Sequence, residues 1–187
     1  MRGVVQTASS CEGKKAAMDA RFLLSKPLVR AYATFFVCIV VLYTLLRTSV
    51  MRELIGQPLA MAFTVVGGFV LNLLSLKATT SGTVLQVEGF AARIDDVCTG
   101  IFVVAIFFSA VLAYPSRTKE KLKGFLLGAS VIFSLNLIRV VSLMYIGRYF
   151  PSFFETAHLL IWQSLVIFAA LLAWIYWTER FVSAPQH

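Results

Sequence analysis

Three side chains of this sequence are of types that could cleave a peptide bond: a cysteine, an arginine and a histidine, each beside a different apolar segment. They are Cys98 in Asp95-Asp96-Val97-Cys98-Thr99-Gly100-Ile101, Arg139 in Asn136-Leu137-Ile138-Arg139, and His158 in Glu155-Thr156-Ala157-His158. A thiolate attacks a carbonyl carbon, an imidazole accepts and returns a proton near neutral pH, and a guanidinium stabilises an oxyanion. We therefore treat these three as candidate catalytic residues.

Cys98 is expected in the first turn of an apolar helix. Free amide N–H groups and the positive end of the helix dipole favour the thiolate at such a position. Asp95 and Asp96 oppose this effect, unless they turn away or pair with Arg93 or Arg139. The alternative role is that of a small buried apolar side chain, the commonest role of a free cysteine.

Arg139 is a charge within an apolar stretch. A guanidinium at the centre of a membrane helix costs about 2.5–3.5 kcal/mol on insertion scales, so an interaction must offset that cost. The charge could serve catalysis, or it could snorkel to the interface or pair with Asp96. Asn136, one turn away on the same face, could line a polar cavity with Arg139 or hydrogen-bond to another helix.

His158 is one of only two histidines, the other being His187. Its imidazole could act as a general acid and base. The alternative is an interfacial residue at a helix start. The neighbouring aromatic residues Phe153 and Phe154 are expected to dip into lipid.

The composition indicates a protein solvated by lipid: 59% of residues are hydrophobic, 14% are charged and the mean hydropathy is +0.82. The net charge of +8 comes from basic residues beside hydrophobic segments, a pattern typical of cytoplasmic helix ends that contact anionic headgroups and not of nucleic-acid binding. The cysteines at Cys11, Cys38 and Cys98 have no CxxC spacing, so we expect no metal, cofactor or structural disulfide.

Five apolar segments determine the predicted fold. They cover residues 31–46, 58–76, 97–114, 124–147 and 158–177. Two short β-prone runs flank Glu88-Gly89 within residues 83–94, which predicts a hairpin at the membrane surface. The predicted fold is an all-α integral membrane protein: a bundle of four spanning helices plus one interfacial or re-entrant helix, with a small surface β-hairpin.

Basic residues indicate which segments cross the membrane. The tail of residues 1–29 and the loop of residues 115–123 are both basic, so the positive-inside rule places both in the cytoplasm. An even number of crossings must then separate them, although three apolar segments lie between. Residues 58–76 contain Gly67-Gly68 and Asn72, which lower helix stability and insertion tendency. We therefore expect this segment to lie in the interface or to re-enter.

This topology places the candidate catalytic residues on the outer side of the membrane. It also divides the chain into a cytoplasmic N-terminal tail of residues 1–29, a transmembrane domain of residues 30–178 and a cytoplasmic C-terminal tail of residues 179–187. No separate soluble domain is expected, because most of the chain is spent on apolar helices and short loops.

Around the candidate residues the sequence resembles the exosortase/archaeosortase family, most of all its short exosortase H-type branch. The core of that family has a Cys before a small residue and Gly, then an Asn-x-x-Arg helix, then a His. The matching residues are Cys98-Thr99-Gly100, Asn136-Leu137-Ile138-Arg139 and His158. Thr99 departs from the commoner Ser or Asn, and acidic Asp95 and Asp96 before the cysteine are a second departure.

The resemblance implies a membrane-embedded cysteine protease or transpeptidase. Cys98 would form a thioester, His158 would be the acid and base, and Arg139 would stabilise the oxyanion or the substrate. The implied partners are exported proteins that end in a short motif, a transmembrane helix and a basic cluster. The implied location is a prokaryotic cytoplasmic (inner) membrane, with the site facing the periplasm or exterior.

Two other classes of function remain open from the residues alone. In a noncatalytic membrane subunit, Arg139 would pair with an acid and Cys98 would merely pack. In a small anion transporter, Arg139 and Asn136 would bind the anion.

Overall fold

The structure is a computed structural model that describes residues 26–182 of the chain. Four of its helices are long and apolar enough to cross a membrane. They are Leu28–Leu46, Ser49–Leu73, Thr118–Tyr149 and Pro151–Phe181. This number of long helices, together with a small sheet, agrees with the all-α membrane bundle predicted from the sequence. Large apolar side chains on their outer faces are exposed, as lipid contact requires.

The elements follow one another in this order along the chain. The first part contains α2 (Lys26–Leu46), α3 (Ser49–Met51), the π-helical turn η1 (Arg52–Gly56) and α4 (Gln57–Leu73). A sheet of β1 (Thr79–Ser81), β2 (Val84–Val87) and β3 (Phe90–Arg93) comes next. The 3-10 turn η2 (Asp96–Thr99), α5 (Ile101–Ala113) and α6 (Thr118–Tyr149) follow. The last part contains η3 (Pro151–Phe153), α7 (Phe154–Thr156), the π-helical turn η4 (Ala157–Ile161) and α8 (Trp162–Phe181).

The segment predicted to lie in the interface, residues 58–76, is part of a longer helix. α3, η1 and α4 join into one apolar run of 25 residues, which by length and composition could cross a membrane. The interfacial or re-entrant placement of residues 58–76 stays a prediction. Pro58 does not interrupt the run, because it stands in the first turn of α4. The side-chain amide of Asn72 exchanges hydrogen bonds of 2.6 and 3.0 Å with the backbone of Ala78, which fixes the turn out of α4.

The segment predicted to cross at residues 97–114 is shorter than expected. α5 has 13 residues, about 20 Å at the usual helical rise, whereas a bilayer core is about 30 Å thick. The helix cannot begin earlier because Gly100 has a left-handed φ of +82° and separates η2 from α5. Cys98 therefore belongs to a separate turn and not to the first turn of an α-helix, as the sequence had led us to expect.

α6 is longer than the predicted segment of residues 124–147. It begins at Thr118, inside the predicted basic loop, and its 32 residues make a helix about 48 Å long. A hydrogen bond at its N-terminus explains why the helix begins before residue 124. The Glu120 carboxylate accepts this bond from the backbone N–H of Arg117 at 3.0 Å. α6 is thus the longest element, and it extends beyond the thickness of a bilayer core.

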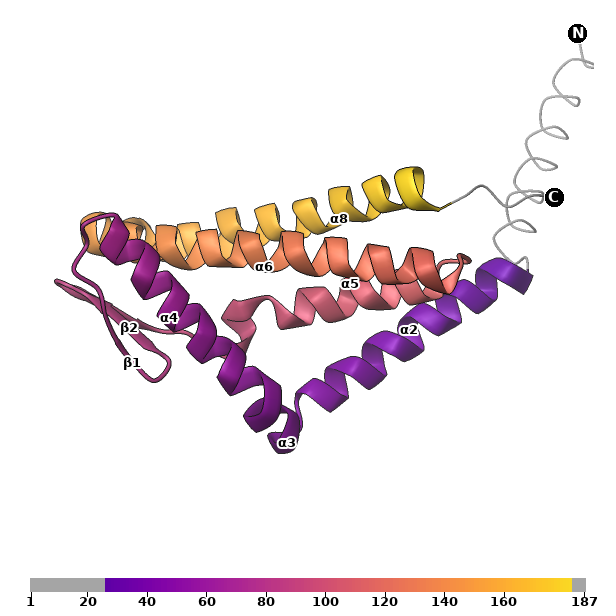
Figure 1. Cartoon of the computed structure of the whole chain (residues 1–187), viewed down its shortest axis with the longest axis horizontal. Helices are drawn as coiled ribbons and strands as arrows, with labels where there is room; N and C mark the ends of the chain where they lie inside the picture. The colour runs from indigo at the N-terminus through magenta and orange to yellow at the C-terminus, as the bar shows by residue number, and fades with distance from the viewer. Residues whose placement is uncertain (1–25, 183–187) are drawn as a thin grey trace, which may run out of the picture.

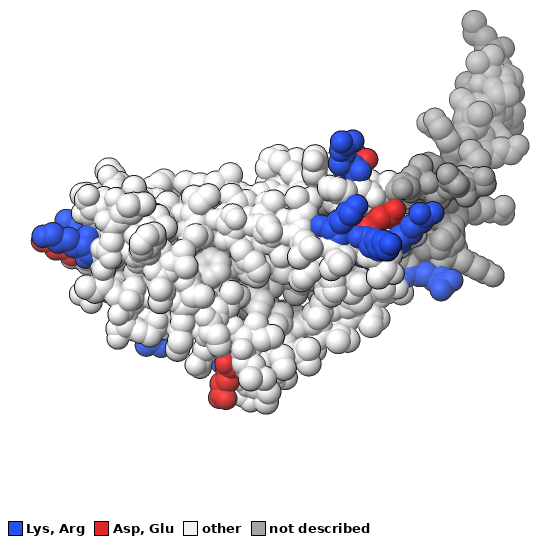
Figure 2. Space-filling view, viewed as in Figure 1, with Lys and Arg blue, Asp and Glu red and all other residues white. Residues whose placement is uncertain are grey.

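The elements form a bundle elongated along α6 (Figure 1). α8 lies along α6, α5 lies along the half of α6 nearest its start, and α2 packs on α5. α4 packs on α6 towards its other end, so α2 and α4 together lead the chain from one end of the bundle to the other (Figure 1). Figure 2 shows basic side chains gathered at the end where α6 begins, and a broad uncharged surface beyond them.

The sheet lies at the end of the bundle where α6 finishes. An ion pair of 3.0 Å between Arg148 of α6 and Glu88 of the β2–β3 turn holds it there. The hairpin predicted around Glu88-Gly89 is confirmed, and β1 adds a third antiparallel strand in the order β1-β2-β3. Gly82 and Gly89 have positive φ values, +60° and +81°, in the two turns of the sheet, a conformation that glycine adopts without strain.

The predicted tails fall largely outside the described residues. Of residues 1–29, only the last four are described, and they belong to α2. At the other end α8 continues to Phe181. The division into two cytoplasmic tails and one transmembrane domain therefore stays a prediction.

Two glycines of α6 allow its neighbours to approach closely. Trp177 of α8 is fully buried against Gly124, and its indole N–H donates a 2.7 Å hydrogen bond to the carbonyl of Glu120. One turn further on, the ring of Phe107 from α5 occupies the space that a Cβ at Gly128 would need. These contacts hold α5, α6 and α8 together.

Replacing Gly128 by valine should therefore destabilise the bundle, because the added side chain must displace the Phe107 ring. We expect a loss of about 1–3 kcal/mol, the usual cost of overpacking a core. The matched control is Ser130→Val on the exposed side of α6. Thermal unfolding of both variants in detergent would measure the difference, and equal melting temperatures would contradict this packing.

Candidate active site

The three candidate catalytic residues line one cavity of about 410 Å³. Cys98 comes from η2, Arg139 from the C-terminal half of α6 and His158 from η4. The remaining walls are β3 with the two residues that follow it, three apolar residues of α6, and α7; their lining residues are Phe90, Ala91, Ala92, Arg93, Ile94, Asp95, Val140, Leu143, Met144 and Phe154. The cavity is therefore mostly apolar, with a few polar groups at defined positions.

Cys98 is held in a short turn between β3 and α5. Its backbone N–H donates to the carbonyl of Asp95 at 2.9 Å. The buried hydroxyl of Thr99 donates to the carbonyl of Asp96 at 2.6 Å, which closes the same turn. The side chain of Cys98 is partly buried. Thr99 was noted above as a departure from the family pattern. Its hydroxyl stabilises the turn through this hydrogen bond.

Gly100 ends this turn and makes the tightest backbone contact of the site. Its φ of +82° is one that residues with a side chain rarely adopt. A Cβ at this position would also overlap the side-chain amide of Asn136, with its Cγ only 2.8 Å away. The turn that carries Cys98 therefore rests directly on α6.

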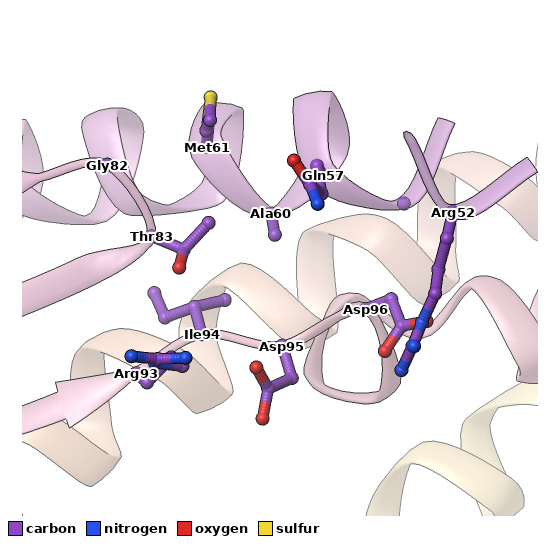
Figure 3. Close-up of a pocket in the computed structure, with 11 residues that line it drawn as sticks. Arg52, Gln57, Ala60, Met61, Gly82, Thr83, Arg93, Ile94, Asp95 and Asp96 are labelled. Atoms are coloured by element: carbon purple, nitrogen blue, oxygen red, sulfur yellow. The ribbon is translucent and has the colours of Figure 1, made fainter. Parts of the chain in front are cut away.

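Asp96 pairs with neither Arg93 nor Arg139, the partners considered from the sequence. Its carboxylate faces Arg52 of η1, with Nε–Oδ2 at 3.5 Å (Figure 3), and its Oδ1 accepts from the N–H of Val97 at 3.0 Å. The Asp96 side chain is only 11% exposed. The positive charge of Arg52 thus balances the negative charge of Asp96, two residues before Cys98. No feature of the sequence indicated this ion pair.

Arg139 is 7% exposed and lies in the wall of the cavity. Its Nη2 donates to the backbone carbonyl of His158 at 3.4 Å, which links α6 to η4. Its buried Nε has no hydrogen-bond partner among residues 26–182. A buried donor without a partner is costly, and here it belongs to a side chain that lines a cavity.

Asn136 does not line this cavity, as one reading of the sequence had proposed. It is fully buried beneath the Gly100 turn, and its Nδ2 donates to the carbonyl of Ile132 in its own helix at 2.8 Å. Its Oδ1 has no partner within the described part of the chain. Asn136 therefore supports the cysteine turn from below.

His158 is oriented by an aromatic neighbour one turn before it. The ring of Phe154 stacks on the imidazole with centroids 5.8 Å apart and planes at 21°, and Phe90 of β3 packs on Phe154 at 5.1 Å. The expectation that Phe154 dips into lipid is wrong, whereas Phe153 is 45% exposed. His158 stands in a π-helical turn, a feature frequent at functional sites.

Sequence reasoning thus missed several residues of the site. The four-residue spacing of Phe154 and His158 could have signalled their contact on one helix face. The Arg52–Asp96 pair and the Phe90–Phe154 contact had no signal, because each joins segments far apart in the chain. Within residues 26–182, no group of three His, Cys, Asp or Glu side chains could hold a metal ion.

A family model described as transmembrane exosortase matches residues 20–177. This match covers the whole site and well over half of the chain. Comparison with curated proteins and with solved structures gave no significant match.

Replacing Gly100 by alanine should destabilise the protein more than the same change at Gly89. Both glycines have left-handed φ values, +82° and +81°, so each variant carries the usual strain of about 1–2 kcal/mol. Only at Gly100 does the new methyl group also overlap Asn136; nothing lies within 4 Å of a Cβ at Gly89. Thermal unfolding in detergent should show an additional loss of about 1–3 kcal/mol for Gly100→Ala. Similar losses for both variants would argue against the Asn136 contact.

Removing the partner of Asp96 should lower the reactivity of Cys98. In Arg52→Gln the carboxylate of Asp96 loses its balancing charge, which disfavours the nearby thiolate. We expect Cys98 to react with a maleimide about two- to fivefold more slowly near neutral pH, the effect of a partly exposed ion pair.

The matched control is Arg52→Gln combined with Asp96→Asn, which removes both charges and should restore the rate. The measurement needs a background in which Cys11 and Cys38 are alanine, so that only Cys98 is labelled. Slow labelling in the double variant as well would show that Arg52 acts through the position of the turn and not through its charge.

Proposed function

Because this chain belongs to the transmembrane exosortase family and is a multi-pass membrane protein, we propose that it is a cysteine protease or transpeptidase. In this proposal it cleaves the C-terminal sorting signals of exported proteins inside the cavity that Cys98, Arg139 and His158 line. The observation that carries the proposal is this convergence: three segments far apart in the sequence bring a thiol, a guanidinium and an imidazole to one cavity.

The first step is attack on the peptide carbonyl. His158 accepts the proton of the Cys98 thiol, and the sulfur forms a bond to the carbonyl carbon. The pair of electrons of the C=O double bond moves to the oxygen, which becomes an oxyanion. The stacking of Phe154 on the imidazole supports this role, since it limits the orientations that His158 can adopt.

Arg139 stabilises the oxyanion. Its Nε–H has no acceptor in the described part of the chain, so this group can donate a hydrogen bond to the oxyanion that forms in the cavity. A preorganised donor of this kind acts strongly where water is largely excluded. The alternative role of Arg139, to hold the substrate, uses the same group.

The intermediate then collapses to a thioester. The bond between carbonyl carbon and peptide nitrogen breaks, and His158 returns its proton to the leaving amine. Attack by water on the thioester gives hydrolysis, and attack by another amine gives transpeptidation. In either case the acyl group leaves the sulfur, and the Cys98 thiol is regenerated with a proton from the nucleophile.

The proposed substrates are exported proteins with a short C-terminal motif, a transmembrane helix and a basic cluster. We place the protein in a prokaryotic cytoplasmic membrane, with the cavity facing the periplasm or exterior. The position of the sheet supports this orientation, because the Arg148–Glu88 pair holds it at the end of α6 opposite the basic start of that helix. The positive-inside rule assigns the basic end to the cytoplasm.

The test is to replace Cys98 by alanine. We expect the exported proteins to accumulate with their C-terminal signals uncleaved, because no thioester can form. The matched control is Cys38→Ala in α2, since Cys38 is also a partly buried free cysteine but does not line the cavity. Immunoblots of the exported proteins measure processing. Normal processing in Cys98→Ala cells that contain the variant at wild-type level would rule out this function.

A further inference from the structure

The strand β3 has a free edge at the catalytic cavity. The sheet has the order β1-β2-β3, so β3 pairs with β2 on one side and, within residues 26–182, with no strand on the other. All of β3, Phe90–Arg93, together with Ile94 and Asp95, lines the cavity that contains Cys98. A free strand edge is a template for another extended chain.

The pairing with β2 determines which backbone groups are free. Val87 pairs with Phe90 across the two-residue turn, and the N–H of Ile94 donates to the carbonyl of Thr83 at 2.8 Å. Hydrogen-bonded pairs alternate along an antiparallel ladder, so the backbone groups of Phe90, Ala92 and Ile94 face β2. Those of Ala91 and Arg93 consequently face the free edge.

These two residues are accessible. Ala91 and Arg93 are exposed, whereas Ala92 between them is partly buried and Ile94 is buried. Figure 3 shows the next residues, Asp95 and Asp96, leading from the strand into the turn that holds Cys98. The free edge therefore leads along the cavity towards the nucleophile.

We propose that the substrate polypeptide binds as a fourth strand along the free edge of β3. The inference rests on the proposed function and names how that site holds its substrate. The bound segment is the extended stretch that precedes the cleaved bond, and it forms hydrogen bonds with the backbone N–H and C=O groups of Ala91 and Arg93. Strand addition of this kind derives its affinity from the main chain.

The direction of the bound segment follows from the position of Cys98. The acyl group that remains on the sulfur is the C-terminal end of this segment, and β3 itself runs from the hairpin tip towards the cysteine turn. The segment therefore runs parallel to β3, entering beside Glu88-Gly89 and ending at Cys98. Its evenly spaced, slanted hydrogen bonds are those of a parallel pair.

The apolar lining of the cavity suits an extended chain. Leu143 and Met144 of α6 and the ring of Phe154 line the same cavity as β3 and contribute apolar surface to it. Side chains of an extended peptide point alternately to the two faces of the sheet. Main-chain binding at β3 then holds the carbonyl in position, while Arg139 and Cys98 remain available for the reaction.

Proline at Ala91 tests this inference, because it removes the N–H that faces the substrate and leaves the ladder with β2 intact. Proline is tolerated at edge positions whose N–H is not used by the sheet. We expect Ala91→Pro to slow cleavage about tenfold or more. This factor corresponds to the loss of one hydrogen bond whose contribution lies at the upper end of the range usual in proteins. Cleavage is followed by pulse-chase on an exported protein that accumulates uncleaved in Cys98→Ala cells.

The matched control is Thr80→Pro on the opposite edge of the sheet. Thr80 is exposed, and its N–H faces away from β2, because Ser81 and Val84 form the hydrogen-bonded pair at the turn. Thr80 does not line the Cys98 cavity, so cleavage should stay near the wild-type rate. Membrane levels and maleimide labelling of Cys98 show whether each variant retains its fold.

The outcomes separate this inference from the proposed function. Wild-type cleavage in Ala91→Pro, while Cys98→Ala is inactive, overturns strand addition and leaves the catalytic proposal standing. Equal slowing in Ala91→Pro and Thr80→Pro also overturns it, since the effect would then be one of sheet stability. If Ala91→Pro does not accumulate, a benzophenone amino acid at Ala91 in the Cys98→Ala background must crosslink the same exported protein, and the same label at Thr80 must not. Failure of that crosslink counts against the inference.

Discussion

The structure depends on one constraint: a guanidinium has to be accommodated within an apolar helix bundle. Arg139 is 7% exposed, about 15 Å from the end of α6 by helical rise, and lipid offers no partner for its charge. The fold provides the carbonyl of His158 and a cavity that opens beside the guanidinium. The other walls of this cavity come from β3, η2, α6 and α7.

The short α5 is the main consequence. Gly100 stops it with a left-handed φ and lets the preceding turn rest on Asn136. The sheet lies at the end of the bundle where α6 finishes, and within residues 26–182 its strand β3 pairs with β2 on one edge only. The protein thus combines a cavity that contains polar side chains with an outer surface of apolar side chains.

Charges near the site are placed in pairs that leave the reacting groups free. Arg52 balances Asp96, and Arg148 balances Glu88 at the hairpin tip. Neither pair uses Arg139. Aromatic contacts orient His158 in a similar way, because Phe154 and Phe90 connect η4 to β3. The site is therefore built by β3, η2, α6 and the region from α7 to η4, and no single element contains it.

The sequence alone determined the membrane class, the number of long helices, the hairpin around Glu88-Gly89 and the family, because hydropathy, turn residues and motifs are local properties. It also singled out Cys98, Arg139 and His158 as candidates, since reactive types are rare in apolar segments. Only the tertiary structure decided that the long apolar run includes α4, that α5 starts after Gly100, and that Asp96 faces Arg52. These features depend on contacts between segments distant in the chain, and a local pattern carries no information about which distant side chain will fill the adjoining space.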